Sequence, residues 1–112
     1  MNRKMTAVKT IVKNEFDAAV ATHTDFVLMV HVPWCDICKS VAPAFAKLSL
    51  QYAAIPFFTA ELNENFELVT KTLKAKSYPT FFFYKEGVCK KTVVGANIDD
   101  VSSTLAQFNF LT

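Results

Sequence analysis

Two cysteines three residues apart, Cys35 and Cys38, constrain this chain more than any other feature. They lie between an apolar run at 26–32, which is typical of a buried strand, and a segment at 39–53 with apolar residues at helical spacing. The pair therefore stands where a strand ends and a helix begins. Unpaired amides and the helix dipole at such a point favour an anion, and the thiolate is the reactive form of cysteine. The arrangement predicts a redox site.

Composition and length limit the other classes of function. With 112 residues, of which 52% are hydrophobic, the chain is long enough for one packed core, and we expect a single domain over residues 1–112. The net charge is +2, and no basic block or arginine cluster indicates a nucleic-acid partner. No apolar run approaches the roughly 18 residues of a membrane span, so we expect no membrane partner.

Three cysteines are too few, and odd in number, for a disulfide-stapled secreted scaffold. Arg3 and Lys4 near the start have no apolar stretch behind them, so we expect no secretory signal. We expect an intracellular, cytoplasmic protein, with mitochondrial import as the alternative that a basic start allows. The third cysteine, Cys89, falls in a predicted strand, and we expect it to have no role. The alternatives are regulatory oxidation and intermolecular pairing.

Strands alternate with helices along the chain. Strands are predicted at 7–12, 26–32, 55–60, 80–84 and 88–94. Helices are predicted after a cap at Asn14, after Cys35 with helical spacing over 39–53, and at 66–73 and 99–110. The third helix is expected to turn Phe66, Val69 and Leu73 inward. This alternation predicts a parallel core, to which the last two strands add an antiparallel edge.

Together these features resemble the thioredoxin family. The residues that carry the resemblance are Trp34-Cys35-x-x-Cys38-Lys39, Pro43 in the helix that follows, Tyr78-Pro79-Thr80, the Lys85-Glu86-Gly87 turn and Gly95. The match extends from about Ala7 to Phe110. It implies an α/β thioredoxin fold, with a five-stranded mixed sheet in the strand order 1-3-2-4-5 flanked by four helices.

The resemblance also implies an enzyme, a thiol–disulfide oxidoreductase that exchanges electrons with protein disulfides. Cys35 would be the exposed nucleophile, Cys38 the buried resolving thiol and Pro79 a cis proline facing them. A reductase or a small dithiol would donate the electrons. We expect no bound cofactor or metal, and a monomer.

Substrate docking is expected beside the cysteines. The backbone of Tyr78 would pair with an extended substrate segment, a form of strand addition. An apolar platform would surround Cys35, formed by Trp34, Ile37, Tyr78, Gly95 and Ala96.

The dipeptide between the cysteines departs from the family pattern, because Asp36-Ile37 replaces Gly-Pro. A negative charge beside Cys35 disfavours the thiolate, so Asp36 is expected to raise the pKa of that thiol. The alternative is that Asp36 is simply a solvated residue of the first helical turn. Ile37 removes a φ restraint and restores an N–H, which should change the stability of the disulfide.

Three further departures concern the region behind the cysteines. Met29 stands where the family has a buried aspartate, His31 where it has an aromatic residue, and Glu61 where it has the lysine that accompanies the aspartate. Residues two apart in a strand share a face, so His31 should lie on the face of Met29 and closer to the cysteines. It either fills the space of the lost aromatic residue or handles protons for Cys38.

Two other classes of function stay open on the sequence. One is a metal or iron–sulfur binder in which Cys35 and Cys38 from two copies meet across a dimer. The other is a non-catalytic module that keeps the fold as a docking platform.

Overall fold

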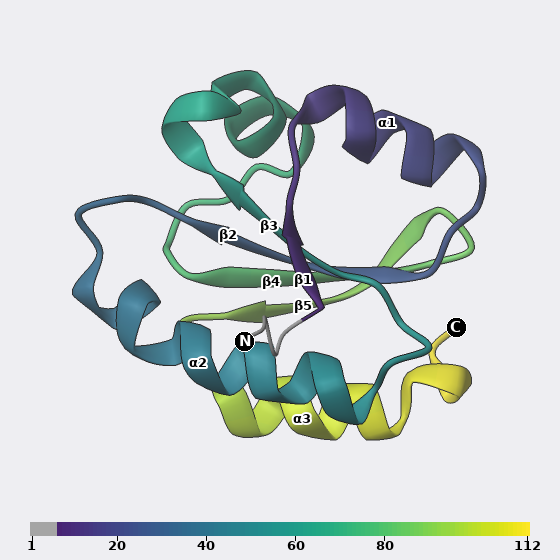
Figure 1. Cartoon of the computed structure of the whole chain (residues 1–112). Helices are drawn as coiled ribbons and strands as arrows, with labels where there is room; N and C mark the ends of the chain where they lie inside the picture. The colour runs from purple at the N-terminus through teal and green to yellow at the C-terminus, as the bar shows by residue number, and fades with distance from the viewer. Residues whose placement is uncertain (1–6) are drawn as a thin grey trace, which may run out of the picture.

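A five-stranded mixed sheet with helices on both faces organises the protein (Figure 1). The computed structural model describes residues 7–112, so the basic start with Arg3 and Lys4 lies outside the described residues. The strands are β1 (Val8–Thr10), β2 (Phe26–His31), β3 (Phe57–Glu61), β4 (Thr80–Lys85) and β5 (Val88–Val94). The helices are α1 (Lys13–Ala21), α2 (Asp36–Gln51) and α3 (Ile98–Ala106), with shorter turns η1 (Leu62–Glu64), η2 (Leu68–Thr72) and η3 (Phe108–Phe110).

The strand order β1-β3-β2-β4-β5 confirms the order that the family resemblance implies. The β1, β3 and β2 strands are parallel, and β4 and β5 add antiparallel pairs. Strand β2 therefore lies at the centre of the sheet. Helices α2 and α3 cover one face, and α1 and η2 cover the other, so the four expected helices are present (Figure 1).

Strand β2 is nearly all apolar because both of its faces are buried. Val27 and Met29 belong to the core cluster under α2 and α3, whereas Phe26, Leu28 and Val30 belong to the cluster under α1 and η2. Each of these five side chains is at most 3% exposed. A strand covered on both faces has no solvent face, so alternation disappears from its sequence.

The start of α1 differs from the sequence-based expectation, whereas the start of α2 agrees with it. Helix α1 begins at Lys13, so the expectation that Asn14 caps it was wrong. The backbone N–H of Val12 instead donates to the carboxylate of Glu15 at 3.1 Å. Helix α2 begins at Asp36, directly after Cys35 as the sequence predicted, and Cys35 itself occupies the N-cap position.

The expectation that Phe66 points inward was also wrong. Its side chain is 61% exposed, whereas Leu68 and Val69 are at most 1% exposed. The reason is the winding of η2, a π-helix in which the Leu73 N–H donates to the Leu68 carbonyl at 2.8 Å. A π-helix has more residues per turn than the 3.6 of an α-helix, so Phe66, which precedes it, no longer falls on the inward face of this segment.

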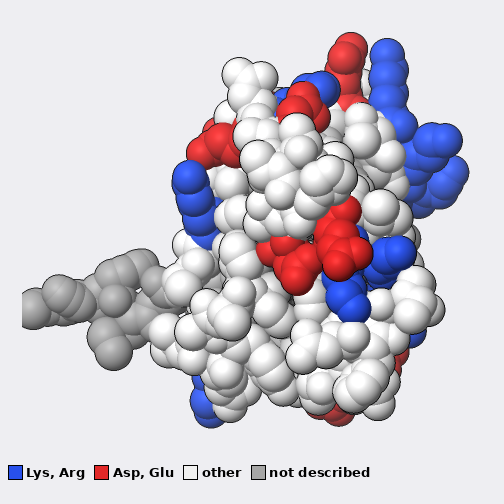
Figure 2. All heavy atoms as spheres, turned by 90° about the vertical axis from the view of Figure 1, so that its right-hand side faces the viewer, with Lys and Arg blue, Asp and Glu red and all other residues white. Residues whose placement is uncertain are grey.

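The surface shows no single-sign charged face at the end of the molecule opposite the β2–α2 junction. Both acidic and basic side chains lie on that face, in small groups with uncharged surface between the groups (Figure 2). Among the described residues, no helix has both the length and the apolar character needed to cross a membrane.

The core under α2 gives a direct stability test. Phe45 is 1% exposed, and its ring lies 4.9 Å from that of Phe57 and 5.4 Å from that of Phe81. We expect Phe45→Ala to lower the free energy of unfolding by about 3–5 kcal/mol, since it removes a buried ring and leaves a cavity. Urea denaturation followed by circular dichroism measures the change.

Phe66→Ala is the matched control, because it removes the same ring from an exposed position. It should change the free energy of unfolding by no more than about 0.5 kcal/mol. Equal losses for the two variants would contradict the assignment of Phe45 to the core.

Candidate active site

The junction of β2 and α2 places Cys35 at the start of a helix. Cys35 is the N-cap residue, with extended backbone at φ −96° and ψ 103°, and its Sγ accepts a hydrogen bond from the Cys38 N–H at 3.0 Å. That amide is one of the donors that a first helical turn leaves without a backbone partner. In the reduced protein the same donor favours a thiolate on Cys35, because hydrogen bonds to an anion stabilise it.

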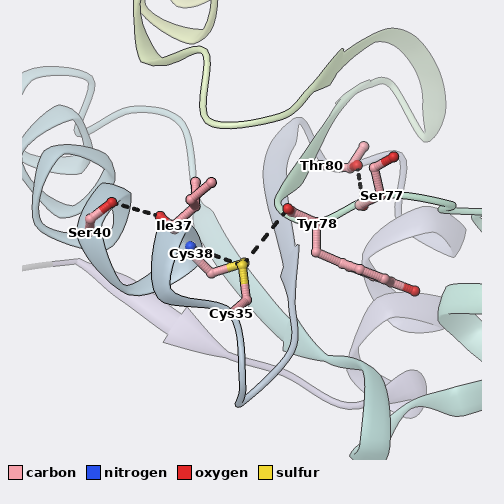
Figure 3. The surroundings of a disulfide bond; sticks show 7 residues. All are labelled: Cys35, Ile37, Cys38, Ser40, Ser77, Tyr78 and Thr80. Atoms are coloured by element: carbon pink, nitrogen blue, oxygen red, sulfur yellow. Dashed lines mark hydrogen bonds between the residues drawn. A yellow bond between two sulfur atoms is a disulfide. The ribbon is translucent and has the colours of Figure 1, made fainter.

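Cys35 and Cys38 form a disulfide with their Cα atoms 5.2 Å apart (Figure 3). The two sulfurs are not equally reachable, since Cys35 is partly exposed and Cys38 is only 3% exposed. The pair therefore presents one sulfur to an approaching partner and covers the other.

The segment before β4 faces the disulfide. The Tyr78–Pro79 peptide is cis, as the sequence predicted, and the Tyr78 carbonyl oxygen lies 3.8 Å from the Cys35 Sγ. The Thr80 hydroxyl donates to the Ser77 carbonyl at 2.7 Å (Figure 3), and the Gly95 N–H donates to the Pro79 carbonyl at 2.8 Å. These two bonds fix the segment on both sides of Pro79. Sequence reasoning missed the Ser77–Thr80 bond, whose only signal is a serine and a threonine flanking the Tyr-Pro pair.

The surroundings of Cys35 are apolar and exposed. Trp34 is 67% exposed and Ile37 is 58% exposed, a combination that is typical of a surface that meets partners. Ala96 is exposed as well, and Gly95, at φ +85°, reaches the site through its bond to Pro79. The ring of Tyr78 turns away from the sulfurs and packs against the α1-side core, so this residue faces Cys35 with its backbone (Figure 3).

A cleft of about 430 Å³ reaches Cys38 on the side of β2 and β3. It is lined by the three residues that depart from the family pattern, Met29, His31 and Glu61, together with Cys38 and Lys39. Sequence reasoning missed the threonines Thr10 and Thr59 that also line it, because only the β1–β3–β2 register brings these strands together. Lys39 was noted only as part of the cysteine motif.

His31 is half-buried in this cleft. Burial lowers the pKa of its imidazole below the ordinary value of 6.5, because an imidazolium is poorly solvated there, and the carboxylates of Glu61 and Glu64 oppose the change. Met29, at 3% exposure, offers no group that could take a proton.

The remaining residues of interest lie outside this arrangement. Cys89 is a free, exposed cysteine on β5, and the expectation that it has no role stays a prediction. Asp36 is exposed in the first turn of α2. Within residues 7–112 no three histidine, cysteine or acidic side chains come together as a metal site.

Comparison with known proteins gives matches of three kinds. The family profile described as Thioredoxin matches residues 7–107. Thioredoxin-1 of Saccharomyces cerevisiae is 31% identical over 93 residues, which cover 83% of this chain and 89% of the yeast protein. Thioredoxin H3 of Arabidopsis thaliana is 38% identical over 72 residues, or 64% of this chain.

The chain spans about 60% of the length of the plant H-type relatives it matches, H3 and H5 of Arabidopsis thaliana and H5 of Oryza sativa. Among solved structures, thioredoxin f from spinach chloroplast superposes with a TM-score of 0.84 at 28% identity, covering 96% of this chain and 99% of that one. The family profile covers nearly the whole chain and includes both cysteines, the cis proline and all five strands. The chain belongs to the thioredoxin family.

Proposed function

We propose that this protein is a thiol–disulfide oxidoreductase of the thioredoxin type, which reduces disulfides in other proteins through Cys35 and Cys38. The observation that carries the proposal is the unequal pair at the start of α2. One sulfur is reachable and receives an amide hydrogen bond, and its partner three residues later is covered. An enzyme that forms a mixed disulfide and then resolves it needs one accessible cysteine to attack the substrate and a second, protected cysteine to release it.

The reaction begins from the reduced pair. The Cys35 thiolate attacks one sulfur of a substrate disulfide, the substrate S–S bond breaks, and the released sulfur leaves as a thiolate that takes up a proton. Cys35 is then joined to the substrate in a mixed disulfide. The Cys38 thiolate attacks the Cys35 Sγ, the bond between Cys35 and the substrate breaks, and the second substrate thiolate leaves. Two electrons have passed to the substrate, and the Cys35–Cys38 disulfide remains.

Proximity makes the second step fast. The Cα atoms of Cys35 and Cys38 are held 5.2 Å apart by the first turn of α2, so Cys38 acts at a high effective concentration. A separate thiol from solution would have to find the mixed disulfide by diffusion.

The substrate lies against the segment before β4. The Tyr78 carbonyl oxygen, 3.8 Å from the Cys35 Sγ, accepts a backbone N–H of the substrate chain beside its cysteine. Exposed apolar side chains at Trp34, Ile37 and Ala96 contact the residues that flank the substrate disulfide. This recognition is largely independent of substrate sequence, because backbone groups and apolar contacts carry it.

A reductase or a small dithiol returns the electrons, without a bound cofactor in this chain. An ordinary thioredoxin reductase would serve it less well than it serves Gly-Pro thioredoxins, because Asp36-Ile37 occupies the surface beside Cys35. We place the protein in the cytoplasm, with a mitochondrial location as the alternative. The relative that bears on the alternative is the mitochondrial thioredoxin O of Oryza sativa, 37% identical over 73 residues.

Trapping tests the order of the two cysteines. The Cys38→Ser variant should accumulate a covalent mixed disulfide with a disulfide-containing peptide, because attack by Cys35 proceeds and resolution does not. Cys35→Ser should accumulate none. Intact-mass spectrometry of acid-quenched samples measures both, and Cys89→Ser, which removes a free exposed thiol, is the control for off-site reaction. Trapping on Cys35→Ser but not on Cys38→Ser would reverse the assignment.

The charge of Asp36 is tested by its amide. Asp36→Asn should lower the pKa of the Cys35 thiol and raise its alkylation rate at neutral pH by roughly two- to fivefold, since a negative neighbour no longer opposes the thiolate. Iodoacetamide alkylation at a series of pH values measures the pKa. Asp99→Asn makes the same change in the first turn of α3 and should leave the rate unaltered. If the two variants behave alike, Asp36 is only a solvated helix residue.

A further inference from the structure

We propose that His31, paired with Glu61 on the neighbouring strand, is the base that removes the proton from Cys38 in the resolving step. The inference rests on the proposed function, because it concerns the second half of the same exchange. It assigns to this chain a proton path made by a histidine and a glutamate in the place of a buried aspartate.

The need for a base follows from the burial of Cys38. A thiol that is 3% exposed ionises with difficulty, because low polarity disfavours the thiolate. The reacting form is nevertheless the thiolate. Met29, which lines the same cleft, is also 3% exposed and accepts no proton. Some other group that shares a space with Cys38 must do so.

The cleft behind the active site supplies that space. His31 and Cys38 both line the same cavity of about 430 Å³, which is large enough to admit water between them. His31 follows Met29 by two residues on β2 and so lies on the same face, nearer the end of the strand that leads to α2. A ring nitrogen of His31 can then take the Cys38 proton directly or through one water molecule.

Glu61 is placed to support the histidine. In the parallel pairing of β2 with β3, His31 and Glu61 are register partners, so their side chains leave the sheet at the same level and on the same face. A carboxylate beside an imidazole stabilises the imidazolium that forms when the proton arrives.

The other charges around His31 favour the same direction of transfer. Glu64 of η1 adds a second carboxylate that stabilises an imidazolium, and Lys39 of α2 lines the cleft beside Cys38, where its ammonium favours the thiolate. Burial keeps the pKa of His31 below its ordinary value, so the ring is in its neutral, proton-accepting form at neutral pH.

The chemistry balances without a further reactant. The Cys38 S–H proton passes to the neutral ring of His31, and the Cys38 thiolate attacks the Cys35 Sγ. The Cys35–substrate bond breaks as the Cys35–Cys38 bond forms, and the substrate sulfur leaves with the electron pair. The imidazolium then returns its proton to solvent or to the departing thiolate.

Single-turnover kinetics separate this step from the attack by Cys35. Reduced full-length protein is mixed with a disulfide peptide and quenched in acid, and mass spectrometry follows the rise and fall of the mixed disulfide from about pH 5 to about pH 9. In the wild type, the rate of decay should reach a plateau once His31 is neutral. In His31→Gln it should fall about tenfold or more at neutral pH and keep rising until Cys38 ionises unaided. The rate of formation should be the same in both.

His23→Gln is the matched control, because His23 is the other histidine of the chain and its ring contacts the Glu86 carbonyl at 3.2 Å, away from the cysteines. Both of its phases should coincide with those of the wild type. Superimposable decay profiles for His31→Gln and the wild type would overturn the inference while leaving the proposed function intact. If neither a mixed disulfide nor the reduced peptide forms in wild type and control alike, the proposed function itself is contradicted.

Glu61→Gln gives an independent test that does not alter the base. Removing the carboxylate should shift the inflection of the decay profile to lower pH, since the imidazolium loses its partner. Proton NMR of the two histidine rings in the reduced protein should show the same shift for His31 and none for His23. An unmoved His31 titration would exclude Glu61 as its partner.

Discussion

The hydrogen bond from the Cys38 amide to the Cys35 sulfur is the interaction on which the site depends. It exists only because α2 begins at Asp36, which makes Cys35 the N-cap residue and turns a free amide of the first turn toward its sulfur. The helix is held in that position by side chains buried against the sheet, among them Val41 and Phe45. Strand β2, covered on both faces, fixes the point from which the chain enters the helix. Packing of the apolar core thus fixes the direction of the Cys38 N–H toward the Cys35 sulfur.

Much of the fold could be predicted because its signals are local. A strand buried on both faces is almost continuously apolar, as 26–30 and 81–84 are, and the strand order followed from the family resemblance. Phe66 could not be placed, since a π-helix changes the period on which an inward face is deduced. The start of α1 also escaped, because Glu15 reaches back to the Val12 amide, and that bond outweighs the capping preference of Asn14.

The site divides in the same way. The cysteines and the cis proline are visible in the sequence as short motifs, whereas the cleft behind Cys38 is assembled from three strands and α2. Glu61 lies thirty positions from His31 and meets it only through the parallel register. The two cysteines and the cis proline thus keep the family pattern, although Asp36-Ile37 between the cysteines does not. Behind them, on our proposal, a histidine paired with a glutamate accepts the proton that a buried aspartate accepts elsewhere in the family.

The reduction potential of the Cys35–Cys38 pair tests the central claim, that this disulfide is a working redox couple. Equilibration in dithiol–disulfide buffers of graded potential, followed by alkylation and intact-mass spectrometry, counts the open and closed forms. We expect a single two-electron transition between about −270 mV, the value of a thioredoxin-type reductant, and about −120 mV, that of a strong oxidant. A pair that never closes, or one that stays closed below about −300 mV as structural disulfides do, would contradict the account.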